Sequence, residues 1–91
     1  MENFRIGEIV FWSCGLNNGF GVVSEIIENH KIIPESNAGT CYKVIHVYYE
    51  SNTVVDFHYE NSLKSIFQLD FKPNMVLKEK LIEVQTSLVN L

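Results

Sequence analysis

The segment from Phe4 to Glu25, FRIGEIVFWSCGLNNGFGVVSE, limits the fold more than any other part of the chain. Gly7 is followed by β-branched and aromatic residues, which suit a first strand opened by a glycine turn. Residues 13–19 are rich in Gly and Asn, which tolerate turn conformations, so the sequence predicts a loop there. A second strand is expected over residues 20–27. This strand–loop–strand pattern predicts a small, strongly bent β-structure.

The length and composition of the chain indicate one globular domain. Its 91 residues are too few for two separate cores, and 46% of them are hydrophobic, which is enough to bury one. No stretch approaches the ~18 consecutive apolar residues of a membrane helix, and the N-terminus has no signal-peptide pattern. Two cysteines are too few for a disulfide framework. We therefore expect a cytoplasmic protein that does not contact membranes.

The formal net charge of −4 argues against direct binding of nucleic acid, because such binding depends on Lys and Arg neutralising phosphates. The basic residues are also scattered along the chain rather than gathered in one stripe. A protein segment or a small ligand is the partner that this composition favours. The basic residues are Arg5, Lys31, Lys43, Lys64, Lys72, Lys78 and Lys80.

Two further strands are expected after a long hairpin connection over residues 28–40. Residues 41–49 and 53–59 are rich in β-branched and aromatic side chains, and residues 50–52 suit a tight turn between them. Within the second strand, Gly21 predicts either a bulge or a close approach of another backbone. Both features are typical of strongly bent sheets.

The C-terminal segment, residues 73–91, is expected to form a helix with one apolar face. It begins at Pro73, and proline suits the first turn of a helix. That face would either cover the β-structure or pair with a second copy of the chain. Two heptads are short for a free coiled coil, so packing on the β-structure is favoured and a homodimer is the alternative. The apolar face consists of Leu77, Leu81, Val84, Leu88 and Leu91.

Four segments between residues 4 and 66 carry short motifs that follow one another in a defined order. A Gly-acidic-x-Val-x-aromatic opening is followed by an aromatic in the second strand, a run of the form Val-x-x-x-x-Tyr-x-Asn, in which Ser51 stands in the place of the Asn, and a closing turn that ends at Leu. These segments are Gly7–Trp12 (GEIVFW), Phe20, Val44–Ser51 (VIHVYYES) and Asn61–Leu63.

This order of motifs resembles the Tudor type of the Src-homology-3-like small β-barrels. The resemblance implies a strongly bent barrel over residues 1–69, followed by the helix over residues 73–91. In that family, several aromatic side chains form a cage that binds methylated Lys or Arg by cation–π attraction. The resemblance assigns Trp12, Phe20 and Tyr49 to the ligand-binding face. The alternative is that Trp12 and Phe20 simply pack in the core, as large aromatics usually do in small domains.

The residues that could support catalysis or metal binding lack the surroundings of known sites. Cys14 with His46 or His58 is the one conceivable nucleophile–base pair, and no catalytic motif surrounds it. Cys14, Cys41, His46 and His58 are conceivable zinc ligands, but none of the short chelate spacings is present. The sequence therefore predicts no enzyme, no cofactor and no metal site.

Taken together, these observations predict a non-enzymatic binding or adaptor module that engages a protein segment or small ligand through an aromatic face. Two alternatives remain open. One is a structural or assembly subunit that self-associates or docks through the C-terminal helix. The other is an acidic inhibitor of a nucleic-acid- or nucleotide-binding protein, which the charge and size would allow.

Overall fold

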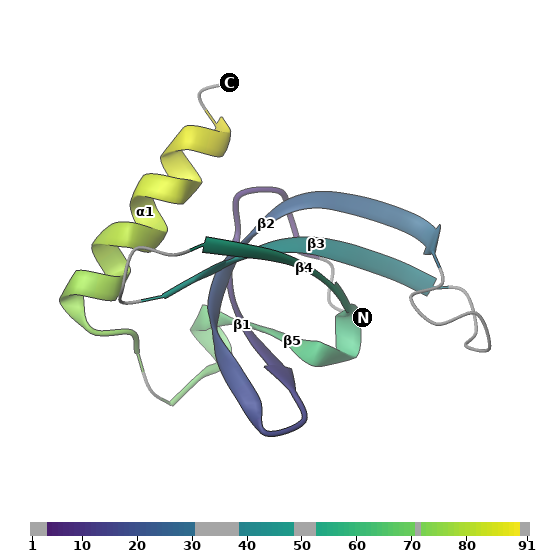
Figure 1. Cartoon of the computed structure of the whole chain (residues 1–91), viewed down its shortest axis with the longest axis horizontal. Coiled ribbons are helices and arrows are strands. Elements are labelled where there is room, and N and C mark those ends of the chain that lie inside the picture. The colour runs from purple at the N-terminus through teal and green to yellow at the C-terminus, as the bar shows by residue number, and fades with distance from the viewer. Residues whose placement is uncertain (1–3, 31–38, 49–52, 71, 90–91) are drawn as a thin grey trace.

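A computed structural model describes residues 4–30, 39–48, 53–70 and 72–89 of the chain. In these residues the strands form an antiparallel sheet in the order β4-β3-β2-β1-β5, with a helix at the C-terminal end (Figure 1). The prediction of a mainly β structure followed by a C-terminal helix is therefore confirmed. The elements are β1 (Ile9–Cys14), β2 (Asn17–His30), β3 (Gly39–Val47), β4 (Thr53–Tyr59), the 3₁₀ turn η1 (Glu60–Ser62), β5 (Leu63–Ser65), the 3₁₀ turn η2 (Ile66–Gln68) and α1 (Met75–Val89).

The strands β1 and β2 form a tight hairpin, so the predicted loop over residues 13–19 is wrong. Gly15 and Leu16 alone separate the two strands, and Gly15 has a φ of +62°, a left-handed conformation that favours glycine. Residues 17–19, which the sequence assigned to the loop, pair with residues 12–14 of β1. Backbone pairing with β1 outweighs the weak strand propensity of Asn and Gly there.

The long strand β2 pairs with β1 over residues 17–22 and with β3 from Phe20 to His30. Its register with β3 shifts after Val23 and again after Ile27. At Gly21 the backbones of β2 and β3 come close together: a Cβ atom there would lie 2.7 Å from the carbonyl oxygen of Ile45 and 2.7 Å from Cγ1 of Val44. The close approach predicted at Gly21 is therefore confirmed, and the register shifts lie farther along the strand.

Both strands of the β2–β3 pair extend into the segment 28–40 that the sequence assigned to a connection. β2 continues to His30 and β3 begins at Gly39, while residues 31–38 lie outside the described part of the chain. The turn predicted at residues 50–52 also lies outside it. The strand predicted over residues 41–49 is shorter at its end, because β3 finishes at Val47.

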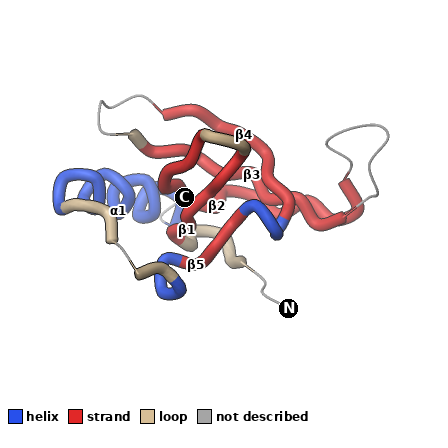
Figure 2. The backbone as a smooth tube through the Cα atoms, turned by 90° about the horizontal axis from the view of Figure 1, so that it is seen from below, coloured by secondary structure: helices blue, strands red, loops and turns tan. Residues whose placement is uncertain are grey.

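The sheet curls strongly, as Figure 2 shows from below. Strands β2 and β3 lie between β1 and β4 in the sheet. If the sheet were flat, β1 and β4 would therefore lie about 14 Å apart. Yet the ring of Trp12 on β1 lies 5.8 Å from the ring of His58 on β4. The curl therefore gives the sheet an inner face, on which side chains from distant strands meet. Its apolar cluster consists of Phe4, Val10, Trp12, Val23, Tyr42, Val44 and Leu63.

The helix α1 covers the other side of the sheet, which we call the outer face. The helix begins at Met75 rather than at Pro73, because Asn74 caps it: the Leu77 amide donates to Oδ1 of Asn74 over 2.9 Å. Farther along, Nε2 of Gln85 donates to the carbonyl oxygen of Gly7 over 2.6 Å. In the described part of the chain no helix is long and apolar enough to cross a lipid bilayer.

The apolar face of α1 packs on the sheet of its own chain. Leu81 is fully buried there and forms one cluster with Phe20, Val22 and Val47. The face predicted for a homodimer is therefore occupied by the chain itself in this structure. Leu77, Val84 and Leu88 are partly buried against the same cluster, and Leu91 lies outside the described residues.

The substitution Leu81→Ala should lower the free energy of unfolding by about 2–5 kcal/mol, because it removes a fully buried side chain between helix and sheet and leaves a cavity. Ile82→Ala is the matched control, since the Ile82 side chain is 44% exposed and should cost much less. Urea unfolding followed by the fluorescence of Trp12 measures both. Equal losses in the two variants would contradict this packing of α1.

Candidate functional site

Trp12 and Phe20, which the sequence assigned to a shared ligand-binding face, lie on opposite faces of the sheet. Phe20 pairs with Phe11 across the hairpin, and the two rings contact each other at 5.5 Å on the outer face. Trp12 pairs with Gly19 and belongs to the inner cluster. Both side chains are buried, with 5% exposure for Trp12 and 8% for Phe20. These two residues therefore do not form walls of one site, and Tyr49 lies outside the described residues.

The surroundings of Trp12 explain why β2 has glycine at position 19. The indole Nε1 of Trp12 donates to the carbonyl oxygen of Phe20 over 3.2 Å. A Cβ atom on Gly19 would lie only 3.0 Å from the indole ring, so the absence of a side chain makes room for Trp12. On the inner face the indole stacks on the imidazole of His46, with ring centres 3.9 Å apart and ring planes 7° from parallel.

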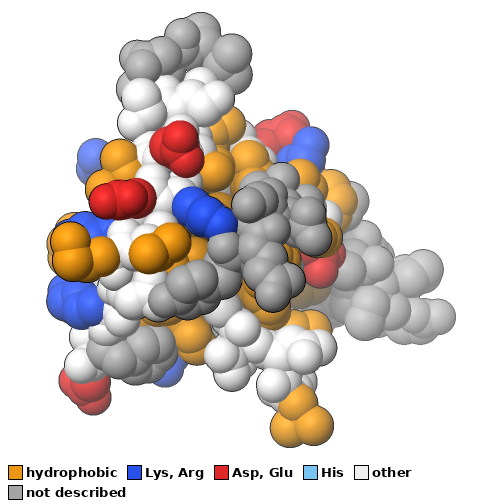
Figure 3. Space-filling model, turned by 60° about the vertical axis from the view of Figure 1, so that its left-hand side comes forward, with side chains coloured by type: hydrophobic (Ala, Val, Ile, Leu, Met, Phe, Trp, Pro, Cys, Tyr) orange, Lys and Arg blue, Asp and Glu red, His pale blue; other side chains and the backbone are white. Residues whose placement is uncertain are grey.

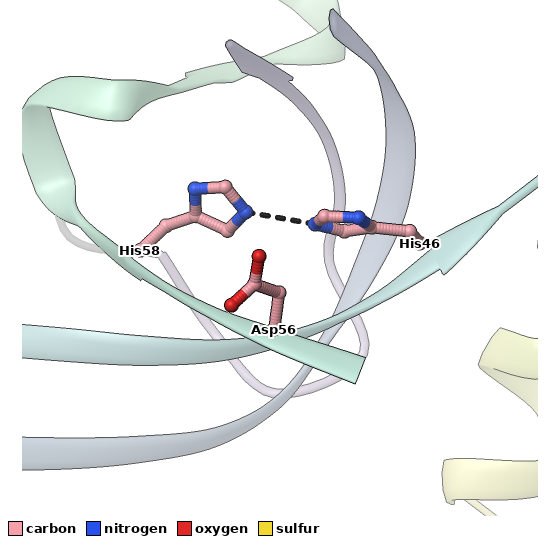
Figure 4. Close-up of side chains that lie close together, drawn as sticks. All are labelled: His46, Asp56 and His58. Carbon is pink, nitrogen blue, oxygen red and sulfur yellow. Dashed lines mark hydrogen bonds between the residues drawn. The ribbon is translucent and has the colours of Figure 1, made fainter. Parts of the chain in front are cut away.

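The inner face also holds a pair of histidines whose side chains meet. His46 comes from β3 and His58 from β4, and each side chain is only 4% exposed. Their Nε2 atoms lie 2.7 Å apart, so one ring donates its Nε2–H to the other (Figure 4). The Oη of Tyr48 lies 3.4 Å from Nδ1 of His46, the other nitrogen of that ring. The two imidazoles are therefore held in one arrangement by stacking and hydrogen bonding.

Burial keeps both histidines neutral. Loss of hydration lowers the pKa of His46 to about 4, with repulsion from a charged His58 as the second cause. Burial also lowers the pKa of His58. The Asp56 carboxylate opposes both shifts, because a negative charge favours imidazolium. Neutral imidazoles each keep a nitrogen lone pair, which can accept a hydrogen bond or bind a metal ion.

Asp56 completes a cluster of three side chains that could hold a metal ion. It lies on β4 two residues before His58, and its carboxylate points toward the gap between the two imidazoles (Figure 4). The ligand atoms of His46, Asp56 and His58 all lie within 4.8 Å of one another. Asp56 is exposed, so the cluster extends from the buried pair to the solvent.

Sequence reasoning considered His46 and His58 as ligands but missed Asp56. It placed them with Cys14 and Cys41, whereas no cysteine belongs to the cluster within the described residues. The available signal was the alternation of β4, in which Asp56 and His58 share a face. The register of β3 against β4, which puts His46 on the same face, was not visible in the sequence.

Neither cysteine is a member of that cluster, and the two differ in exposure. Cys14 is exposed at the end of β1, whereas Cys41 is fully buried on β3. Burial raises the pKa of the Cys41 thiol, and a backbone hydrogen bond with His58 only partly offsets this. A buried thiol with a raised pKa is a poor nucleophile.

The chain matches no protein-family model, no curated protein and no solved structure. It is a small mainly-β protein whose curled antiparallel sheet is covered on one face by a C-terminal helix. Its inner face carries the histidine pair.

The stability of the metal-free chain should fall as the pH drops from about 6.5 to about 4. The native pKa values of His46 and His58 lie below the ordinary 6.5, so the unfolded chain binds protons first and stability is lost over this range. For His46 the shift to about 4 corresponds to a loss on the order of 3 kcal/mol. Urea unfolding in the presence of a chelator, at a series of pH values, measures it. The stability of the double variant H46Q/H58Q should depend less on pH. An unchanged pH dependence would contradict its assignment to the two histidines.

The two thiols should react with Ellman's reagent in two separate phases. Cys14 should be modified at once because it is exposed, and Cys41 only after denaturant is added because it is fully buried. The variants C14S and C41S should remove the fast and the slow phase, respectively. Rapid modification of both cysteines in the native chain would show that the interior of the sheet is open to solvent.

Proposed function

We propose that this chain is a non-enzymatic, cytoplasmic interaction module with a Src-homology-3-like barrel of the Tudor type, and that it binds an apolar protein segment bearing acidic side chains. The strand order supports this barrel class, since β1 pairs with both β2 and β5 and the 3₁₀ turn η1 joins β4 to β5. The binding surface of the proposal is an apolar groove, different from the aromatic face that the sequence indicated.

The single observation that carries the proposal is a groove of about 500 Å³ between α1, η2 and β1. Several large apolar side chains reach solvent along it, with exposures of 85% for Phe67, 79% for Met75 and 44% for Ile82. Contiguous exposed apolar surface on a small protein commonly marks an interaction site. The groove is lined by Ile9, Ile66, Phe67, Lys72, Pro73, Met75, Lys78, Ile82 and Gln85.

The charges of the groove indicate what kind of segment it would bind. Among the residues that the structure describes, Lys72 and Lys78 line it and no Asp or Glu does, although the whole chain carries a net charge of −4. Figure 3 shows apolar side chains next to basic ones on the face that carries α1, which also bears acidic side chains. A partner segment with apolar residues and nearby carboxylates would complement this surface.

Both elements that present the exposed side chains are fixed by local hydrogen bonds. Ser65 caps η2: its Oγ accepts from the Phe67 amide over 3.4 Å, while its own amide donates to Oε1 of Gln68 over 3.2 Å. Asn74 caps α1 just before Met75. A surface that is already ordered loses less conformational entropy on binding, which favours affinity.

A random peptide library displayed on phage can be panned against the full chain. The groove should select peptides that combine apolar and acidic residues. The affinity of a selected peptide is measured by calorimetry, and Phe67→Ala should lower it roughly fivefold or more, since truncating a central aromatic typically costs over ~1 kcal/mol. The double variant K72E/K78E should weaken the same peptide because it reverses the charge of the groove.

Leu16→Ala is the matched control, because Leu16 is 100% exposed at the tip of the β1–β2 turn and is not part of the groove. Selected peptides without acidic residues, or equal affinities of F67A and L16A, would contradict the proposal. So would a chain that sediments as a dimer and becomes monomeric on Phe67→Ala, because the groove would then belong to a second copy.

A further inference from the structure

We propose that His46, Asp56 and His58 bind a divalent transition-metal ion, with Zn²⁺ as the representative species. This site lies on the inner face of the sheet and is independent of the groove between α1 and η2. It consists of two imidazole nitrogens from neighbouring strands and one carboxylate between them (Figure 4).

The Nε2 atoms of the two histidines already face each other. Their Nε2 atoms lie 2.7 Å apart. Two nitrogens bound to one tetrahedral Zn²⁺ at about 2.0–2.1 Å lie about 3.3 Å from each other, so the rings need to separate by roughly 0.6 Å. Small rotations about the side-chain bonds provide this displacement without a change in the strands.

The chemistry of the three ligands selects the class of ion. Two imidazoles with one carboxylate suit Zn²⁺ and other divalent first-row metals, whereas Mg²⁺ and Ca²⁺ prefer oxygen ligands alone. Asp56 is the exposed member, so the ion would reach the buried nitrogens from the solvent side of this residue. Three protein ligands leave a fourth position of a tetrahedral ion to water.

The neighbours of His46 meet the further requirements of a ligand. For both Nε2 atoms to offer lone pairs, the hydrogen that they share has to leave, and in each ring the proton then resides on Nδ1. Nδ1 of His46 lies 3.4 Å from Oη of Tyr48, and this oxygen can accept a hydrogen bond from the Nδ1–H group. Trp12 stacks on the same ring and holds its plane. Such outer contacts fix the tautomer and orientation of metal-binding histidines.

The test is a calorimetric titration of the full, tag-free chain with Zn²⁺ at neutral pH. We expect one ion per chain. Co²⁺ provides a second readout, because Trp12 is the single tryptophan and its ring lies 3.9 Å from that of His46, so a paramagnetic ion bound there should quench its fluorescence. Excess chelator should restore that fluorescence.

Two variants with the same change in charge separate a specific site from general attraction of cations. Asp56→Asn should weaken Zn²⁺ binding about tenfold or more, because it removes a ligand rather than an outer contact. Asp70→Asn removes one exposed carboxylate outside the cluster and should leave the affinity unchanged. Asp56 is exposed on the edge strand β4, so both variants are expected to fold.

The variant His58→Gln gives an independent check, since it should abolish the quenching by Co²⁺ while the unfolding transition persists. The proposal is overturned if Zn²⁺ does not bind at one per chain. It is also overturned if D56N and D70N bind Zn²⁺ equally, or if H58Q is quenched like the unmodified chain. The histidine pair would then be a hydrogen-bonded element of the core. None of these results depends on whether the groove binds peptides.

Discussion

The close approach of β2 to β3 at Gly21 is the constraint on which the rest of the structure depends. No side chain fits there, because a Cβ atom would lie 2.7 Å from the backbone oxygen of Ile45. Residues 20–22 of β2 pair with β1 on one side and with β3 on the other, and past this point the register of β2 against β3 shifts after Val23. Glycine contacts and register shifts of this kind bend a sheet. The curl that results brings β1 and β4 near each other on the inner face.

The curl also separates the two surfaces that we connect with function. The outer face is occupied by α1, whose Leu81 packs against the sheet, and the groove lies at the border between this helix and η2. The inner face holds the imidazoles of His46 and His58 beneath the ring of Trp12. Because the sheet lies between the two surfaces, a side chain substituted at one surface does not contact the other.

Much of the fold followed from local patterns. β-branched and aromatic runs indicated the strands, and apolar spacings of four and three indicated the helix, since these periods depend only on neighbouring residues. The errors lie where a contact overrides propensity. Asn17 and Asn18 are strand residues because they pair with β1, and the helix begins after Pro73 because Asn74 caps it. The separation of Trp12 from Phe20 follows from the two-residue turn, since a shift of one residue moves a side chain to the other face.

The sequence by itself determined the mainly β class and the amphipathic C-terminal helix. Only the tertiary structure decided that His46 and His58 meet. His46 pairs with Val54, four residues along β4 from His58, so on a flat sheet the two would lie about 13 Å apart along the strand direction. Curvature brings their nitrogens to 2.7 Å, with Asp56 beside them. Residue types and periods are local properties, whereas the shape of a sheet arises from all of its strand pairings at once.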